Sequence, residues 1–311
     1  MGVSAAQLLR QGALRWPERT FVVDVGAPGS PRREASYGAL DARAAAVAAR
    51  LQQCGVQAGE RVALIAENSD AFVAAWFGVL YAGAAVVPIP ILSSAPEIAH
   101  RVRHARCRQI IVDGARKALV DEACASLGGA AAQPVRAVDI MEITVAMAHT
   151  PAPPRDMPPD APALVLYTSG TTGTAKGAIV SHASLVTHTA GLVHHTIGLR
   201  SDDRVLGALP LTHSFGCRMV MLVSAFAGAR CVLLPRFDAE RTLTLLRDEG
   251  ITWLPAVPTM YAAWAQVQGE PPTDRLRGRG GQLRTSSREH FRALQLPEIF
   301  VWVKFCCGIL S

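Results

Sequence analysis

The stretch LVLYTSGTTGTAKG, which runs from Leu164 to Gly177, decides the fold. It begins as an apolar run typical of a buried strand and continues into glycine and hydroxyl residues that lead to Lys176, one of three lysines in the 311-residue chain. Glycine allows positive φ and a close approach of backbone N–H groups to a ligand, while hydroxyls and an ammonium group add further donors. The stretch therefore predicts a strand followed by a loop that holds phosphate oxygens.

The spacing within this loop separates it from other nucleotide-binding loops. A P-loop needs the pattern GxxxxGK[ST] at the start of a helix, whereas GTTGTAKG is followed by the β-rich run GAIVSH at residues 177–182. The dinucleotide pattern GxGxxG is also missing, so a P-loop kinase is disfavoured. The alternative is a solvated hairpin turn; the strand directly before the loop and the rare lysine favour phosphate binding.

Strand-like and helix-like runs alternate along the chain from Ala35 onward, which favours an α/β fold with parallel strands and helical crossovers. We expect two related lobes of mostly parallel sheet flanked by helices, at residues 1–148 and 162–277. The proline-rich residues 149–161 are predicted to link them, and residues 278–311 form an atypical Gly/Arg/Ser-rich tail. The predicted strands are 61–68, 84–90, 109–113, 164–168, 177–182, 204–211, 229–235 and 251–258, and the predicted helices 70–83, 97–106, 184–198 and 238–250.

Composition narrows the class of protein. Half of the residues are hydrophobic, and the formal net charge of +6 comes from scattered arginines rather than a basic stripe, so nucleic-acid binding is not expected. The longest apolar run, residues 71–90, is interrupted by Gly78, Gly83 and Pro88, which argues against a membrane span. Seven cysteines without a CxxC pair indicate a reducing cytoplasm. The spacing of the histidines at 182, 188, 194 and 195 does not predict a metal site.

Several motifs in the right order resemble the adenylate-forming superfamily, which includes acyl-CoA synthetases, luciferases and peptide-synthetase adenylation domains. The signature LYTSGTTGTAKG is the most specific of them. The others are ASYGALDARAAAVAARL (35–51), GERVALIAENSDAFVAAWFGVLYAGAAVVPIP (59–90), GALPLTHSFGC (207–217) and ITWLPAVPTMYAAW (251–264). The resemblance covers about Ala5 to Arg275 and implies the large N-terminal AMP-binding domain of this family, at residues 1–277.

The resemblance implies ATP-dependent activation of a fatty or aryl carboxylic acid as an acyl-adenylate, followed by transfer to a thiol of coenzyme A or a carrier protein. ATP would come with Mg²⁺. His213 matches a position in the acyl pocket, although it could instead cap the helix that follows. Pro258 and Thr259 match a strand end near the substrate, although they could instead form a simple turn. The residues implied to hold the β- and γ-phosphates of ATP are Thr168, Ser169, Gly170, Thr171, Thr172, Gly173 and Lys176.

Other parts of the family pattern are not recognisable in this sequence. These are the glycine-rich adenine segment, the YG.TE segment with its Mg²⁺-binding glutamate, the ribose-binding aspartate, and the C-terminal domain with the catalytic lysine. No catalytic residue or metal ligand is therefore assigned. Because electrostatic donors of this kind are each worth on the order of 10²–10³ in rate, we expect little or no adenylating activity. The alternative is a non-catalytic remnant that keeps the fold and binds a nucleotide weakly or not at all.

Overall fold

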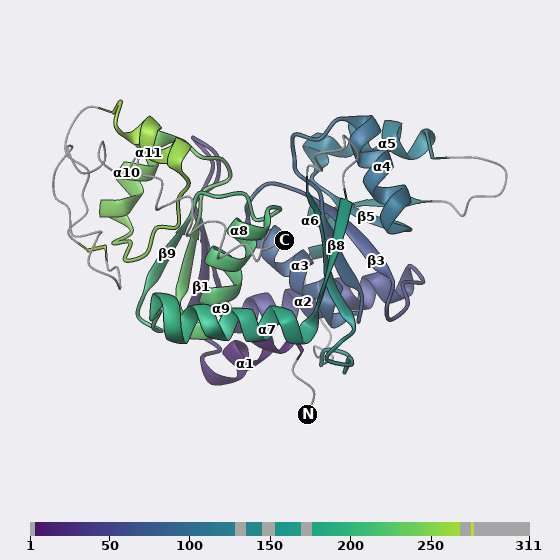
Figure 1. Cartoon of the computed structure of the whole chain (residues 1–311), viewed down its shortest axis with the longest axis horizontal. Helices are drawn as coiled ribbons and strands as arrows, with labels where there is room; N and C mark the ends of the chain where they lie inside the picture. The colour runs from purple at the N-terminus through teal and green to yellow at the C-terminus, as the bar shows by residue number, and fades with distance from the viewer. Residues whose placement is uncertain (1–3, 128–134, 145–152, 169–175, 268–274, 277–311) are drawn as a thin grey trace. The chain divides into compact units, whose positions relative to one another are not determined.

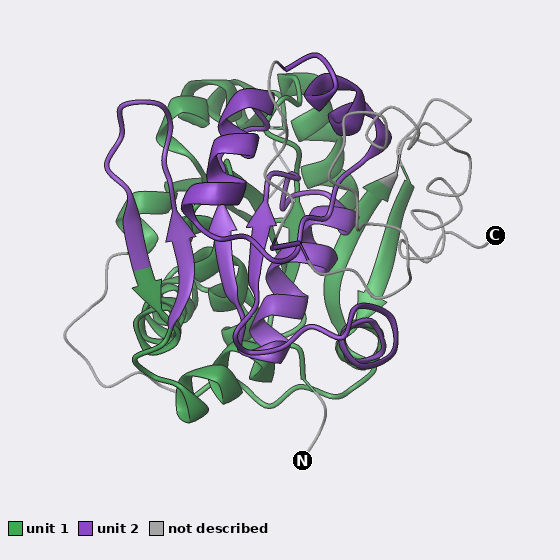
Figure 2. Cartoon of the chain, turned by 90° about the vertical axis from the view of Figure 1, so that its left-hand side faces the viewer, with its two compact units in different colours: residues 1–19, 35–188 green, residues 20–34, 189–311 purple. Residues whose placement is uncertain are grey.

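The computed structural model describes residues 4–127, 135–144, 153–168, 176–267, 275 and 276. The chain divides into two compact units, one of residues 1–19 and 35–188 and the other of residues 20–34 and 189–311 (Figure 2). This division differs from the lobe boundary that the proline-rich segment 149–161 predicts. The reason is that the strand after this segment pairs with a strand before it, so the chain returns to the same sheet.

The first unit contains a sheet of six described strands in the order β6-β5-β3-β4-β7-β8. These strands are β3 (Arg61–Ile65), β4 (Ala85–Pro88), β5 (Gln109–Val112), β6 (Arg136–Asp139), β7 (Pro162–Thr168) and β8 (Lys176–Ser181). The helices of this unit, labelled in Figure 1 where there is room, are α1 (Gln7–Arg15), α2 (Tyr37–Gln53), α3 (Asp70–Tyr81), α4 (Ala95–Ala105), η1 (Gly114–Arg116), α5 (Lys117–Ala125), α6 (Ile140–Thr144) and α7 (His182–Gly191), the last of which continues into the second unit.

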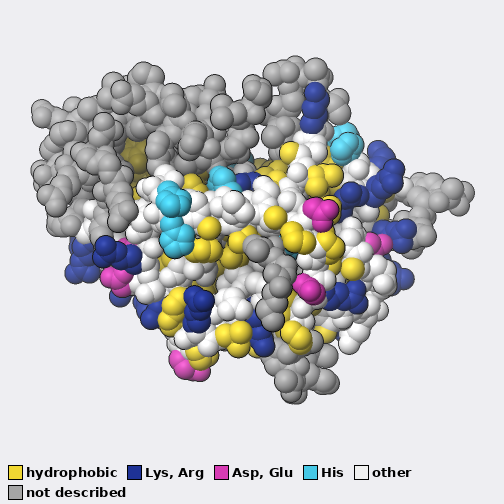
Figure 3. Space-filling view, turned by 60° about the horizontal axis from the view of Figure 1, so that its bottom comes forward, with side chains coloured by type: hydrophobic (Ala, Val, Ile, Leu, Met, Phe, Trp, Pro, Cys, Tyr) yellow, Lys and Arg dark blue, Asp and Glu magenta, His cyan; other side chains and the backbone are white. Residues whose placement is uncertain are grey.

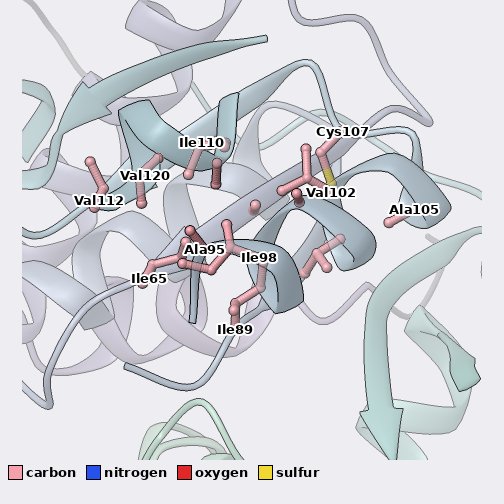
Figure 4. Packing of buried hydrophobic residues seen from close by; sticks show 14 of the residues in the cluster. Ile65, Ile89, Ala95, Ile98, Val102, Ala105, Cys107, Ile110, Val112 and Val120 are labelled. Atoms are coloured by element: carbon pink, nitrogen blue, oxygen red, sulfur yellow. The ribbon is translucent and has the colours of Figure 1, made fainter. Parts of the chain in front are cut away.

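The pairing within this sheet is parallel except at its β8 edge. β3 pairs in parallel with β4 and β5, β5 with β6, and β4 with β7, whereas β7 and β8 are antiparallel. All residues of β4 and β5 are buried, as expected for strands covered on both faces. One core cluster joins β3, β4, β5 and β7 to the apolar faces of α4 and α5 (Figure 4). The parallel α/β fold that the sequence predicts is confirmed.

The second unit contains a sheet of four described strands in the order β2-β1-β10-β9. β1, β10 and β9 are parallel to one another, although β1 lies about two hundred residues before its partner β10 in the chain. The elements are β1 (Thr20–Asp24), β2 (Arg33–Ser36, shared with the first unit), η2 (Leu192–Ile197), β9 (Arg204–Gly207), α8 (Ser214–Gly216), η3 (Cys217–Leu222), α9 (Val223–Ala227), β10 (Arg230–Leu233), α10 (Ala239–Asp248) and α11 (Pro258–Trp264).

Two predicted elements differ in the structure. The predicted strand 251–258 forms only a single bridge, between Trp253 and Val205, because Pro255 and Pro258 lack the N–H groups that a longer ladder needs. Pro258 instead begins α11, where a missing N–H costs nothing. The predicted helix 184–198 is α7 followed by η2, whose six residues are π-helical.

The surface agrees with the scattered charges of the sequence. On the face shown in Figure 3, the described Lys and Arg side chains occur at several separate places, with acidic, histidine and apolar side chains among them. None of the described helices combines the length and the hydropathy that crossing a bilayer requires.

A buried histidine ties the N-terminal segment to the start of α7. His182 is fully buried, and its Nδ1 accepts a hydrogen bond from the backbone N–H of Ala5 at 3.2 Å and lies 3.3 Å from the hydroxyl of Ser4. Burial lowers the pKa of the His182 imidazole below its usual value of 6.5. The ring is therefore held neutral, with Nδ1 free of a proton to serve as the acceptor.

This histidine makes the stability of the fold sensitive to acid. Below about pH 6.5 the unfolded chain binds a proton that folded His182 excludes, so the free energy of unfolding should fall with pH by at most about 1.4 kcal/mol per pH unit. Chemical denaturation between pH 7.5 and 5 should show a shallower pH slope for His182→Asn than for the wild type. His194→Asn, at an exposed position, is the control and should keep the wild-type slope. An unchanged slope in His182→Asn would contradict the assignment.

Candidate functional site

The phosphate loop predicted from the sequence lies between two paired strands. β7 and β8 form an antiparallel hairpin whose register runs from Leu164 opposite Val180 to Thr168 opposite Lys176. The expected placement of the loop between strands is confirmed, and the positions that flank it, Thr168 and Lys176, face each other across the hairpin. The side chain of Lys176 is exposed. The other predicted phosphate ligands, Ser169, Gly170, Thr171, Thr172 and Gly173, lie outside the described residues.

Strand β7 of the hairpin ends at the edge of the sheet where ligands usually bind in open α/β folds. β7 runs parallel to β4, with Leu164 opposite Val86, and β4 runs parallel to β3. The carboxyl ends of these strands, and of β5 and β6, therefore meet at one edge of the sheet, and the loop after Thr168 begins there. The crevice outside the carboxyl ends is the usual ligand position in such sheets.

Tyr167, the residue before Thr168, packs against the opposite strand of the hairpin. It lies directly opposite Gly177, and a Cβ built on Gly177 would come within 3.3 Å of Cζ of Tyr167 and 3.2 Å of Cγ1 of Val165. The glycine of the motif thus leaves room for the tyrosine ring. Burial raises the pKa of the Tyr167 phenol to about 12, so it is a neutral hydrogen-bonding group at physiological pH.

The tyrosine hydroxyl is held by α4. It lies 2.7 Å from Nδ1 of His104 and donates to the backbone carbonyl of Arg101 at 3.2 Å. Since the phenol has one proton, which goes to the Arg101 carbonyl, Nδ1 of His104 is the donor in the other bond. The sequence indicated α4 only as a helix with an exposed face, and the pairing of His104 with Tyr167 across 63 residues could not be read from it.

His213 lies in the second unit, in a tight turn after β9. Its backbone N–H donates to the carbonyl of Pro210 at 3.0 Å, and its Nδ1 accepts from the backbone N–H of Phe215 at 3.2 Å. His213 is thus the N-cap of α8, which is the alternative that the sequence left open. The residue is exposed at the surface, but the protein atoms against its ring lower the pKa of the imidazole by desolvation. A neutral ring can still accept a bond at Nδ1 and donate from Nε2.

The remaining candidates from the sequence are Pro258, Thr259, groups of metal-ligating side chains and the cysteines. Pro258 and Thr259 begin α11 rather than ending a strand, so their predicted position at a strand end is wrong. Among the described residues there is no group of three or more His, Cys, Asp or Glu side chains that could hold a metal ion. The described cysteines, at positions 54, 107, 124, 217 and 231, are free thiols.

Comparisons with known proteins agree with this arrangement. The AMP-binding enzyme family matches residues 9–297, which extends past the motif resemblance that ends near Arg275. The chain is 34% identical over 266 residues to 4-coumarate–CoA ligase 5 of Oryza sativa subsp. japonica, covering 80% of this chain and 46% of the relative. It is 32% identical over 238 residues to feruloyl-CoA synthase of an Amycolatopsis species, covering 74% of this chain and 45% of the relative. The chain thus spans about half the length of these curated relatives.

Solved structures give the same answer. The inhibitor-bound N-terminal domain of FACL13 from Mycobacterium tuberculosis matches with a TM-score of 0.78 at 28% identity, covering 89% of this chain and 69% of that domain. ATP-bound MatB from Rhodopseudomonas palustris matches with a TM-score of 0.71 at 26% identity, covering 84% of this chain and 51% of that protein. By its sequence motifs, its fold and its family match, the chain belongs to the AMP-binding enzyme family, in the adenylate-forming superfamily that includes the acyl-CoA ligases.

Proposed function

We propose that the loop between Thr168 and Lys176 binds the β- and γ-phosphates of ATP and that the chain takes part in activating a carboxylic acid. The observation that carries this proposal is the β7–β8 hairpin, in which the residues that flank the glycine–hydroxyl motif, Thr168 and Lys176, are paired and Thr168 ends a strand at the carboxyl edge of the parallel part of the sheet. The ATP-bound structure of a relative with the same fold supports it. The named phosphate ligands and the acyl-pocket role of His213 are part of the proposal.

The reaction would proceed in two steps with a balanced exchange of bonds. The carboxylate attacks the α-phosphorus of ATP, an oxygen–phosphorus bond forms, and the bond to the β-phosphate breaks to release pyrophosphate. A thiol, of coenzyme A or a carrier protein, then loses its proton to solvent and attacks the acyl carbon; the carbon–sulfur bond of the thioester forms, and the bond from the acyl carbon to the phosphate oxygen breaks to release AMP. In the first step the loop's contribution would be to hold the departing pyrophosphate, on which negative charge develops.

The acid is proposed to be aromatic. Relatives named for coumarate, ferulate and indoleacetate, carboxylic acids that each carry an aromatic ring, support this class over the fatty acids that the motifs also allow. A reducing cytoplasm is the proposed location, which the free thiols of the described cysteines support. We propose that Mg²⁺ enters with ATP as its counter-ion.

A second candidate is a non-catalytic chain that binds a nucleotide without turning it over. It is supported by residues 278–311, where the glycine-rich adenine segment of the family is not recognisable in the sequence. Incubating the purified chain with ATP, Mg²⁺ and a panel of aryl and fatty acids, and measuring pyrophosphate, separates the two. Acid-dependent pyrophosphate release would exclude the non-catalytic candidate. ATP binding without release would favour it, and no ATP binding would overturn the phosphate-loop proposal.

Lys176 gives a direct test of the loop. Lys176→Ala should weaken ATP binding about tenfold, because a hydrogen bond to a charged group contributes about 1.5–3 kcal/mol and this side chain is exposed. Isothermal titration with ATP measures the change. Lys117→Ala is the matched control, since Lys117 pairs with Asp121 on the exposed face of α5 and should leave ATP binding unchanged. If Lys176→Ala and the wild type bound ATP with equal affinity, Lys176 would not be a phosphate ligand.

A further inference from the structure

The base of the hairpin is braced by a helix that is itself firmly placed. α4 begins with a capping box, in which Ser94 and Glu97 each satisfy the other's backbone N–H, and it carries a proline in its first turn. It ends at Ala105, after which Arg106 takes a left-handed conformation with φ 57°. The helix therefore has defined ends and cannot easily change its register.

The apolar face of α4 is anchored in the core of the first unit. Ile98, Ala99, Val102 and Ala105 are buried in the cluster that also contains residues of β3, β5 and α5 (Figure 4). Burying apolar side chains of this size stabilises the position of the helix against the sheet. Because its apolar face is anchored in this way, α4 holds the side chains on its opposite face in fixed positions.

His104 connects this support to β7. Its Nδ1 lies 2.7 Å from the hydroxyl of Tyr167, and the two rings meet edge to face with centroids 5.6 Å apart. The ring of His100, one turn earlier on α4, stacks on His104 at 5.9 Å. Orientation of the imidazole is thus fixed from two directions, and the Tyr167 hydroxyl is fixed by His104 and by the Arg101 carbonyl.

Tyr167, held in this way, contacts both strands of the hairpin. Along the chain it is followed by Thr168, the last paired residue of β7, and across the ladder its ring fills the space over Gly177. A shift of the tyrosine ring would therefore displace the two strand ends from which the loop begins and to which it returns.

We propose that His104 is a positioning residue, which holds Tyr167 and through it the two ends of the loop that grips the terminal phosphates of ATP. The proposal rests on the proposed function of that loop. Its consequence follows from the sensitivity of catalytic and binding geometry to displacement, since a shift of about 1 Å in a positioned group costs as much as 10²-fold in rate. His104 acts through Tyr167 and has no contact with the ligand of its own in this scheme.

The test compares His104→Ala and His104→Asn with the wild type. We expect His104→Ala to bind ATP about 5-fold more weakly, because a loop whose ends are less well fixed should lose contact with the terminal phosphates equivalent to about one ordinary hydrogen bond. AMP should bind with unchanged affinity because it lacks the β- and γ-phosphates. His104→Asn should restore most of the ATP affinity, since its amide nitrogen can donate from near the position of Nδ1. Arg103→Ala, the neighbouring exposed position on α4, is the control and should match the wild type.

Hydrogen exchange in the unliganded chain tests the positioning without relying on ATP. Amides of peptides covering residues 162–168 and 176–181 should exchange faster in His104→Ala than in the wild type, with those of α4 unchanged. Equal exchange in the hairpin, or an equal loss of ATP and AMP binding, would overturn the positioning role. If the wild type does not bind ATP, the proposed function fails, and the exchange experiment still decides whether His104 fixes the hairpin.

Discussion

Asp41→Ala is expected to lower the free energy of unfolding of the first unit by about 3 kcal/mol. Asp41 is a buried residue of α2 that contacts two other helices. Its carboxylate accepts a hydrogen bond from the Tyr81 hydroxyl of α3 at 2.6 Å and forms an ion pair with Arg10 of α1. Burial and the neighbouring carboxylate raise the pKa of Tyr81 well above 10, so the phenol stays a donor. Removing the carboxylate leaves the buried hydroxyl and the partly buried guanidinium without their shared acceptor.

Denaturation of Asp41→Ala by guanidinium chloride, followed by circular dichroism, measures this loss. Asp121→Ala is the matched control, because Asp121 forms an exposed i,i+4 pair with Lys117 and is expected to contribute less than about 0.5 kcal/mol. A variant Asp41→Asn keeps the size and one acceptor and should fall between the two. If Asp41→Ala and Asp121→Ala were equally stable, the buried network would have no role in holding α1, α2 and α3 together.

The strands of the first unit could be predicted because their signal is local. The runs at β3, β4 and β5 are apolar on both faces and are separated by glycine, proline and a capped helix, so the pattern of each segment fixes its type. The β7–β8 hairpin could be predicted for the same reason. Its glycines, hydroxyls and lysine are adjacent in sequence, and their flanking strands pair directly with each other.

What the sequence could not show are contacts between distant segments. β1 pairs with β10, and no pattern in Thr20–Asp24 indicates a partner that follows so much later in the chain. The same holds for His104 and Tyr167: an exposed-face histidine on a helix and a strand tyrosine each have ordinary explanations by themselves. Only the parallel order of the sheet, which is a property of the whole fold, brings α4 beside β7.

Proline and histidine residues account for two segments whose structure differs from what their local sequence pattern indicates. The apolar run after Gly250 was expected to be a strand, yet its prolines limit it to one bridge and then start α11. For His213 the motif suggested a substrate-facing role, while the structure shows a cap on α8 with a neutral ring. The two roles are compatible, because a cap through Nδ1 leaves Nε2 as a donor.

The turn that carries His213 depends on a close backbone approach. Gly216 has ordinary helical dihedral angles, φ −61° and ψ −49°, so its requirement for glycine is not conformational. A Cβ at this position would lie 2.2 Å from the carbonyl oxygen of Pro210 and 2.8 Å from its carbon, both backbone atoms. The first turn of α8 therefore packs against the 209–213 segment so tightly that no side chain fits.

Gly216→Ala is expected to destabilise the second unit by about 2–3 kcal/mol and to shift the His213 turn, because either α8 or the Pro210 backbone must move. Gly191→Ala is the matched control: Gly191 is also helical, at φ −58° and ψ −45°, but a Cβ there meets nothing within 4 Å. That variant should be unchanged or more stable by up to about 1 kcal/mol, since alanine favours a helix. Urea denaturation of both variants gives the comparison. Because the two substitutions are chemically identical and both sites are helical, a difference between them isolates the steric contact with Pro210, and equal stabilities would show that the turn yields without cost.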